Sequence, residues 1–390
     1  MKTLGISVYP DLRPLDEIKE YFRLAGKYGA SRVFSSMFNI EGTPEEVTAY
    51  FRDLIKEAHK YGMKVSLDVN TEFLERMGVT PDDISLFKDI ECDIIRMDGH
   101  YGDKRDVALI NNPYGIKIEF NTSMAENIVK NLIEEGADPD RIITCHNFYP
   151  QPYTGMEWEK FKRINKGIKD ISNMTIAAFV SSNAPETHGV WDAEYGLPTV
   201  EKMRNYPIDL QARLLLATDN VDDILIGNAY ATEEEFAALQ EVLKDESEHD
   251  RKIPEFASVF LPENALEHPK YIKVKADPEA TDYEKEILFG FFPHVDLGDS
   301  SEWIWRSRAP RMFVKDNRIE PRNPHKDMFE FGDVVMVNDN YRHYAGEVQV
   351  VLLPMKNDGM RNLIGHIDFP ENEMLELINA GDVVVFEPQK

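Results

Sequence analysis

The sequence predicts an α/β fold, a (β/α)8 barrel of the TIM type, followed by a small C-terminal all-β domain. Strand-like and helical patterns alternate eight times in the first part of the chain, which is typical of a closed parallel barrel. After a charged run at 244–255, the pattern changes to β-type segments separated by turn residues. The predicted domains are therefore a barrel at 1–248 and a small β-barrel at 255–390.

The first two units show the alternation most clearly. Segment 4–9 has the composition of a strand, and the helical pattern that follows it ends near Gly29. Segment 32–37 is the second predicted strand. The run Thr43-Pro44-Glu45-Glu46 then forms a capping box, with proline at the first helical position, before a helix with one apolar stripe.

The same unit recurs along the rest of the predicted barrel. Further strands are predicted at 63–70, 92–98, 115–121, 141–147, 174–181 and 223–228. Further helices are predicted at 71–77, 124–136, 157–169, 199–218 and 232–244. A doubly wound open sheet is the alternative architecture, but no GxGxxG motif follows the first strand to support it.

The second domain is predicted from strand patterns alone. Its β segments are expected at 271–276, 331–337, 346–354, 363–369 and 382–388, with one short helix at Glu371–Ala380. Many short strands separated by turn residues are typical of a small barrel or sandwich.

Charge excludes several classes of function. Forty-four Lys and Arg against 70 Asp and Glu give a formal net charge of −26. The resulting field repels polyanions, so we expect no nucleic-acid partner and no membrane surface as a partner. A small phosphorylated ligand is compatible with this charge, because it needs only a local nest or one or two arginines.

Cysteine usage and hydropathy indicate a compartment. Cys92 and Cys145 form no CxxC pair, which excludes a cysteine zinc site and favours a reducing environment. The N-terminus lacks the apolar core of a signal peptide, and no segment approaches 18 consecutive apolar residues. We therefore expect a cytoplasmic protein. No cofactor is expected. The oligomeric state stays open, with a dimer among the alternatives.

Three predicted strands carry polar residues where a buried parallel strand is normally apolar. Asp68, Asp98 and Glu119 alternate with apolar neighbours, and side chains along a strand alternate between its two faces. The apolar set must meet the surrounding helices, so the polar set faces the barrel interior, near the strand ends where barrel enzymes place their chemistry. The alternative is an internal salt-bridge network in which Arg96 and Lys117 neutralise these acids.

The loop after the sixth strand, CHNFYPQPYTG at 145–155, combines a His-Asn pair with aromatic rings. Aromatic faces and amides suit a sugar, although the rings could equally pack the loop. Small polar strand ends at 181–183 and 227–230 suit a phosphate, which points to Ser181, Asn183 and Asn228.

Two further features suggest ligand binding. The connection 183–198, which contains His188, is long for a barrel and is typical of a binding loop. In the second domain, Arg306, Arg308 and Arg311 lie beside two tryptophans and could meet an anion; the alternative is an exposed edge strand.

Several segments together resemble one bacterial family. GISVYP, RVFSSMF, MDGHYG, IEFNTS and above all CHNFYPQPYTG resemble the 6-phospho-N-acetylmuramidases, once known only as a domain of unknown function. The resemblance covers essentially the whole chain and implies a catalytic barrel with a cyclophilin-like C-terminal domain. It also implies exo-hydrolysis of N-acetylmuramic acid 6-phosphate β-1,4-linked to N-acetylglucosamine, inside the cell, during peptidoglycan recycling. The expected partner is therefore a phosphorylated amino-sugar disaccharide.

The residue roles come from strand alternation rather than from the resemblance. Asp98 and Glu119 are the predicted carboxylate pair of a glycosidase, with Glu119 as the acid, while Asp68 and Arg96 tune their pKa values. The groups expected to hold hydroxyls and the N-acetyl group are Asn70, Asn121, His146, Asn147 and Tyr149.

The sequence leaves the mechanism of cleavage and the class of activity open. Strand seven ends in SSN instead of a carboxylate, so retaining, inverting and substrate-assisted cleavage stay open. A sugar-phosphate isomerase or epimerase would use Asp68, Asp98, Glu119 and His146 around Mn²⁺ or Mg²⁺. A non-catalytic sugar-binding protein is the third class.

Overall fold

The computed structural model describes residues 2–37, 40–190, 195–244, 269–312, 314, 317–322 and 326–389, with backbone only at 124–126. The chain divides into two compact units, Met1–Leu243 and Lys244–Lys390. The predicted linker at 244–255 and the predicted start of the second domain at 255 lie, apart from Lys244, outside the described residues.

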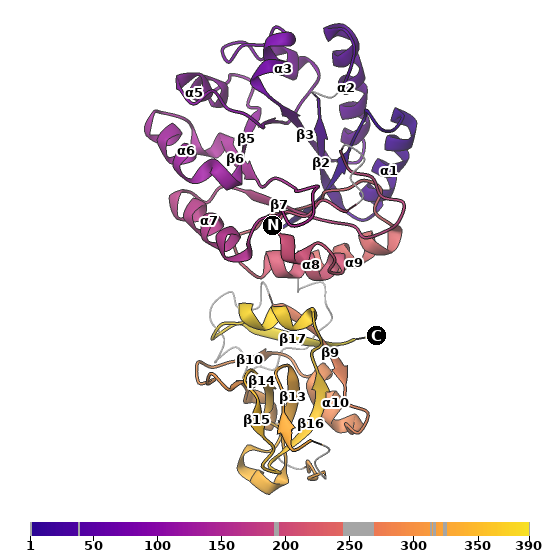
Figure 1. Cartoon of the computed structure of the whole chain (residues 1–390), viewed down its shortest axis with the longest axis vertical. Coiled ribbons are helices and arrows are strands. Elements are labelled where there is room, and N and C mark those ends of the chain that lie inside the picture. Colours follow the sequence, from indigo (N-terminus) through magenta and orange to yellow (C-terminus); the bar gives the residue numbers. More distant parts are fainter. Residues whose placement is uncertain are drawn as a thin grey trace. The chain divides into compact units, whose positions relative to one another are not determined.

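The first unit is a closed barrel of eight parallel strands surrounded by helices (Figure 1). Its strands are β1 (Thr3–Val8), β2 (Ala30–Ser36), β3 (Lys64–Val69), β4 (Ile94–Met97), β5 (Lys117–Asn121), β6 (Ile142–Cys145), β7 (Ile176–Val180) and β8 (Asp223–Ile226). The barrel closes where Gly5 of β1 pairs with Leu225 of β8. The predicted (β/α)8 barrel is thereby confirmed, and the open sheet is excluded.

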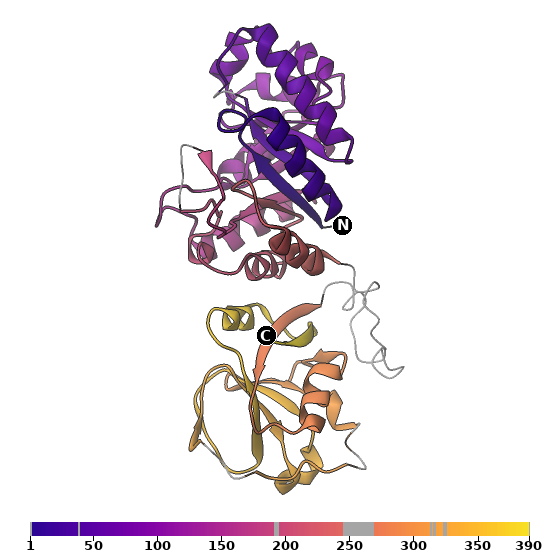
Figure 2. The ribbon, with the colours of Figure 1, turned by 90° about the vertical axis from the view of Figure 1, so that its right-hand side faces the viewer.

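The helices of this unit lie outside the strands (Figure 2). They are α1 (Leu15–Lys27), α2 (Pro44–His59), α3 (Thr71–Arg76), α4 (Ser85–Asp89), α5 (Lys104–Ile110), α6 (Thr122–Glu134), α7 (Trp158–Ile171), α8 (Ile208–Leu216) and α9 (Glu233–Leu243). In α2 the predicted capping box is confirmed: Thr43 accepts from Glu46 N, and Glu46 accepts from Thr43 N. The short α4 and α5 had no prediction.

The predicted helix at 199–218 is wrong in its first half. A short 3-10 turn, η3 (Glu201–Met203), precedes α8 there. Pro207 occupies the N-cap of α8 and has no N–H to donate back to an earlier turn, so the helix begins after it.

The second unit contains a seven-stranded sheet in the order β10-β17-β9-β16-β13-β14-β11. The strands are β9 (Lys270–Ala276), β10 (His294–Val295), β11 (Ile304–Ser307), β13 (Asp333–Val337), β14 (Val348–Val351), β16 (Arg361–His366) and β17 (Val383–Pro388), beside a small pair, β12 (Met328–Phe329) and β15 (Met355–Lys356). All five predicted β segments are confirmed in this unit. Its cyclophilin-like character stays a prediction.

The second unit also contains a helix that the strand patterns did not indicate. Helix α10 (Asp282–Gly290) begins at a capping box of Thr281 and Glu284 and contacts β17. The TDYE run was the missed signal, since Ser or Thr followed three residues later by Glu marks a helix start. The predicted helix at Glu371–Ala380 is a 3-10 helix, η8 (Glu371–Leu377). None of the described helices is both long and apolar enough to cross a bilayer.

Candidate active site

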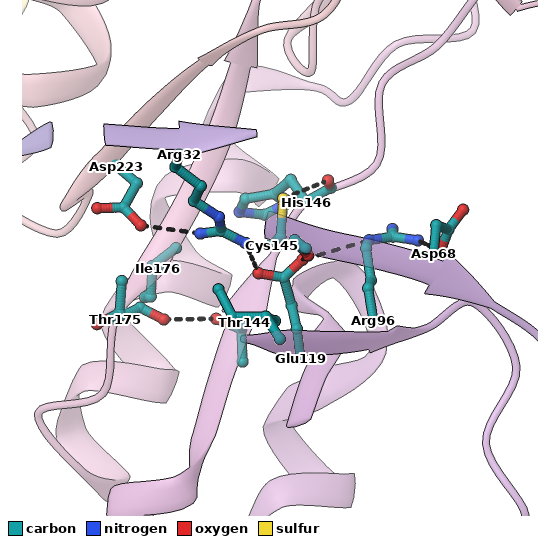
Figure 3. A network of polar contacts seen from close by, with 12 residues as sticks. Arg32, Asp68, Arg96, Glu119, Thr144, Cys145, His146, Thr175, Ile176 and Asp223 are labelled. Carbon is teal, nitrogen blue, oxygen red and sulfur yellow. Dashed lines mark hydrogen bonds and ion pairs between the residues drawn. The ribbon is translucent and has the colours of Figure 1, made fainter. Parts of the chain in front are cut away.

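Polar side chains from β3, β4 and β5 meet inside the barrel. Asp68, Arg96 and Glu119 are register partners on these adjacent strands. Arg96 donates to Asp68 at 2.5 Å and lies 3.7 Å from Glu119 (Figure 3). The neighbours that alternate with them, such as Leu67 and Ile95, are fully buried on the opposite face. The prediction that the polar set faces the interior is confirmed for these three residues.

Glu119 belongs to the lower part of this network, away from solvent. It accepts from Arg32 of β2 and from Ser66, whose Oγ lies 3.3 Å away. Arg32 also donates to Asp223 of β8 at 2.8 Å, and Thr3 donates to the same carboxylate at 2.7 Å. Glu119 has no exposed surface, so this position favours a structural role over contact with substrate.

A glycine of β1 packs closely against Arg32. Gly5 of β1 lies between Arg32 and Leu225 in the strand pairing. A Cβ at Gly5 would lie 2.1 Å from Leu225 Cδ2 and 3.2 Å from Arg32 Cβ, so any side chain would displace both neighbours. Lys117, the cation predicted for this network, is exposed at the other end of β5.

The upper part of the network opens to solvent. One nitrogen of Arg96, Nη1, is 2.5 Å from Asp68 and 3.7 Å from Asp98, while Nη2 donates to Asn147. The Asp98 side chain is 46% exposed, whereas Asp68 is buried. Burial raises the pKa of Asp68 to about 6, against the lowering effect of Arg96, and the charge of Asp98 adds to the rise.

Asp68 and Asp98 both contact Arg96 at the end of the network that faces the mouth. Two carboxylates share one guanidinium, and one is exposed while the other is buried and exchanges its proton near neutral pH. The two carboxylates that contact Arg96 nearest the mouth are thus Asp68 and Asp98, and the catalytic pair of Asp98 and Glu119 stays a prediction.

Aromatic rings lie beside Arg96. The guanidinium is 5.7 Å from the ring centre of Phe34, whose edge-on neighbours Phe148 and Phe179 lie at 5.9 and 5.4 Å. Tyr9 contacts Phe148 edge-on at 6.5 Å, and its hydroxyl donates to the carbonyl of Gly227. Phe34, Phe179 and Tyr9 are buried and pack together, while Phe148 is partly exposed and offers apolar surface of the kind on which a sugar ring packs.

His146 faces away from the barrel interior. It is fully buried, with Nε2 2.6 Å from Asn165 Oδ1 of α7 and its ring 4.7 Å from that of Phe161. Burial lowers the pKa of His146 to about 4, so it is neutral at physiological pH. This position favours packing between β6 and α7 over substrate binding.

The predicted asparagines of strands three and five are helix caps. The Asn70 side chain accepts from Phe73 N at 2.7 Å at the start of α3. Asn121 accepts from Ser123 N at 3.1 Å at the start of α6. Among the predicted amides, Asn147 is the one that bonds to the network of Asp68 and Asp98, because its Oδ1 accepts from Arg96.

The polar ends of strands seven and eight bond to one another. The Ser181 hydroxyl accepts from Leu197 N at 3.0 Å. Asn228 donates to Ser182 O at 2.9 Å and to the hydroxyl of Thr187 at 2.8 Å. These side chains hold the loop that follows β7, and Asn183 donates to Tyr206 O at 3.0 Å.

One buried arginine holds the loops that follow β6 and β7. Arg204 donates to the carbonyls of Tyr149 at 2.9 Å, Gly196 at 3.2 Å and Gln151 at 3.2 Å. It also pairs with Glu201, and this pairing is the main reason that the pKa of Glu201 falls to about 2. Sequence reasoning missed both residues, because their partners lie about 50 positions away on another loop.

The motif glycine at 155 has a steric role in the same scaffold. Glu201 accepts from Tyr153 N at 2.8 Å and from Gly155 N at 2.7 Å. A Cβ at Gly155 would lie 2.9 Å from the backbone of Glu201, too close for any side chain. The loop CHNFYPQPYTG therefore depends on this glycine for its approach to Glu201.

A cavity of about 1560 Å³ lies among these loops. Residues after β1, β6 and β7 line it, including Leu12, Tyr153, Asn183, His188 and Lys202. Its size is sufficient for a ligand larger than a monosaccharide.

In the second unit, the predicted arginine cluster is paired internally. Arg306 forms two bonds of 2.8 Å with the buried Glu347, and Arg308 lies 3.0 Å from Asp299. Arg311 lies 5.5 Å from the ring of Tyr344. Contact of Arg306 with substrate stays a prediction.

The four residues suggested for a metal do not converge. His146 bonds to Asn165, Glu119 to Arg32, and Asp68 to Arg96. Within the described ranges, no group of three or more His, Cys, Asp or Glu side chains is arranged to hold a metal ion.

Comparison with known families accounts for both units. Residues 4–241 match the N-terminal part of the 6-phospho-N-acetylmuramidases, and residues 271–387 match their C-terminal part. The chain belongs to the 6-phospho-N-acetylmuramidase family. The protein is therefore an enzyme of the glycosidase class, whose substrate is a small sugar molecule.

Solved structures share the family fold over the whole chain. An uncharacterized B. cereus protein is 32% identical, covers 99% of each chain and has a TM-score of 0.83. A conserved protein of unknown function from Enterococcus faecalis is 23% identical over 99% of this chain and 96% of its own, with a TM-score of 0.68. A search of curated proteins found no match.

The lower network predicts a large stability effect. Arg32→Met leaves the carboxylates of Glu119 and Asp223 buried without their shared cation, which we expect to cost about 3–5 kcal/mol. Urea unfolding followed by circular dichroism measures it. Arg23→Met is the control, because its side chain is exposed and pairs with Glu20 on the helix surface. Equal midpoints for the two variants would contradict the structural role.

Proposed function

We propose that the protein hydrolyses the β-1,4 bond between N-acetylmuramic acid 6-phosphate and N-acetylglucosamine and releases both sugars. The observation that carries this proposal is the Asp68–Arg96–Asp98 arrangement at the barrel mouth, in a chain of the 6-phospho-N-acetylmuramidase family. Glycoside hydrolysis requires one carboxyl group to protonate the leaving oxygen and a second negative group to stabilise the charge at the anomeric carbon. Asp98 supplies one such group at the mouth, and Asp68 acts on it through their shared Arg96.

Asp98 is the carboxylate that we propose to contact the glycosidic bond. It is the more exposed of the pair and follows directly from the end of β4. Asp68 acts through Arg96: its charge balances the guanidinium that lies next to Asp98. Glu119, which lies on the far side of Arg96 without exposed surface, then supports the network from below.

The sugar itself would pack against Phe148. This ring is partly exposed and contacts Phe34 beside Arg96, and the Asn147 side chain is already in the same network. An intracellular role in peptidoglycan recycling is part of this proposal. Both cysteines are free and buried, which fits a reducing compartment.

Product analysis by mass spectrometry tests the reaction. The purified protein is incubated with the 6-phosphorylated disaccharide and, separately, with its unphosphorylated form, each with and without EDTA. We expect release of N-acetylglucosamine from the phosphorylated form, unaffected by EDTA. If neither disaccharide is cleaved, with or without EDTA, the proposed hydrolysis is contradicted.

The two candidate pairs are distinguished by two isosteric variants. Asp98→Asn is expected to lower kcat by about 10²–10⁴ with an unchanged unfolding midpoint, because an exposed side chain loses its acid–base function. Glu119→Gln is expected to lower the midpoint, because Arg32 loses a buried partner. Steady-state kinetics and urea unfolding on both proteins provide the comparison. The reverse pattern would restore Glu119 as the acid.

Asp68 predicts the pH profile. Below pH about 6 it is protonated and no longer balances Arg96, so kcat/KM is expected to fall as the pH drops through about 6. Asp68→Asn should be poorly active and should lack this limb.

The raised pKa of Asp68 also means that the folded state binds more protons than the unfolded state between pH about 4 and 6. Stability should therefore decrease as pH rises through that window, and less so in Asp68→Asn. An unchanged acid limb in Asp68→Asn would contradict the assignment.

A further inference from the structure

Two basic side chains touch at the rim of the cavity. A guanidinium nitrogen of Arg13, in the loop after β1, contacts Nε2 of His188, in the loop after β7. His188 and Leu12, the neighbour of Arg13, line the cavity. Since Nε2 accepts from Arg13, the ring proton is on Nδ1, and both side chains present donors. An anion beside this pair would accept from the remaining N–H groups of the Arg13 guanidinium and from Nδ1 of His188.

The charge at this point is poorly compensated. Among the described residues, the carboxylate within 4 Å of the Arg13 guanidinium is that of Glu17, at 3.8 Å on the exposed surface of α1. Other arginines around the mouth have closer acids: Arg96 has Asp68, Arg204 has Glu201, and Arg105 has Asp103 at 2.9 Å.

His188 is held in place by the backbone. The backbone N–H of His188 donates to Ala229 O at 2.6 Å, and the backbone N–H of Ala229 donates to His188 O at 2.7 Å. The preceding residue, Thr187, bonds to Asn228, so residues 187 and 188 are both bonded to the segment that follows β8. A site of this kind binds without first ordering a loop, which lowers the entropy cost of binding.

We propose that Arg13 and His188 bind the phosphate ester of the substrate, and this inference rests on the proposed function. The family substrate carries a 6-phosphate, and (β/α)8 barrels frequently bind phosphate at the loops after strands seven and eight. The residues predicted for that purpose, Ser181 and Asn228, are instead bonded within the loops. Arg13 and His188 follow β1 and β7, the two strands that flank β8 in the closed barrel. Since β8 is opposite β4 in that order, the phosphate is bound across the mouth from Asp98.

The kinetic test compares two substrates in three proteins. For Arg13→Met we expect kcat/KM on the phosphorylated disaccharide to fall by about 10–100-fold, mainly through KM, because a charge-assisted phosphate contact is lost. The preference for the phosphorylated over the unphosphorylated disaccharide should shrink by the same factor. Arg13→Lys, which retains charge but not the planar fork, should retain part of the preference. Arg23→Met, on the exposed face of α1, is the matched control and should behave as wild type.

The outcomes separate this inference from the proposed function. If wild type cleaves the phosphorylated disaccharide but Arg13→Met keeps the full preference, the phosphate site is overturned and the function stands. An equal loss on both disaccharides would assign Arg13 to the lactyl carboxylate, which both contain, and would also overturn it.

A binding measurement decides the case in which no cleavage occurs or Arg13→Met does not fold. Calorimetry compares N-acetylmuramic acid 6-phosphate with N-acetylmuramic acid on wild type, Arg13→Lys and His188→Asn. We expect wild type to bind the phosphorylated sugar at least tenfold more tightly, and both variants to lose most of that difference. Equal affinity of wild type for the two sugars would overturn the site.

Discussion

The buried ion pair of Glu119 with Arg32 is the interaction on which the interior of the barrel depends. Arg32 joins β2 to β5 and β8, and Glu119 also faces Arg96, so one carboxylate connects the lower and upper halves of the network. Removing an ionised carboxylate from water is costly unless a cation compensates it. In the lower half, Arg32 is the cation that the carboxylates of Glu119 and Asp223 share. The upper half, where Arg96 serves two carboxylates, leaves charge available at the mouth.

Strand alternation was sufficient to predict this half of the site. Asp68, Arg96 and Glu119 could be placed in the interior because the period of a strand is two residues and the apolar set had to meet the helices. The eight units, the capping box of α2 and the strands of the second unit followed from equally local patterns. Which carboxylate is buried depends on depth within the barrel, and no local pattern encodes depth. Glu119 was therefore expected at the mouth, although it is fully buried.

Contacts between distant loops could not be predicted from the sequence. Arg32 and Asp223 lie 191 positions apart, and Arg204 bonds to carbonyls 53 and 55 positions earlier. Backbone carbonyls have no sequence signature, so an arginine that binds them cannot be distinguished from one on the surface. His146 shows the opposite error, since its place in a polar motif suggested a ligand contact while its strand position turns it toward α7.

Closure of the barrel has a consequence for how the chain is made. Residues 3–6 complete their sheet only by pairing with residues 223–226, so nearly the whole first unit must leave the ribosome before β1 gains its second neighbour. Until then Arg32 and Glu119 lack Asp223, and the lower ion network remains hydrated. Non-local pairing of this kind is slow and leaves strand edges exposed during synthesis. The acidic surface of the chain keeps such nascent molecules apart by mutual repulsion.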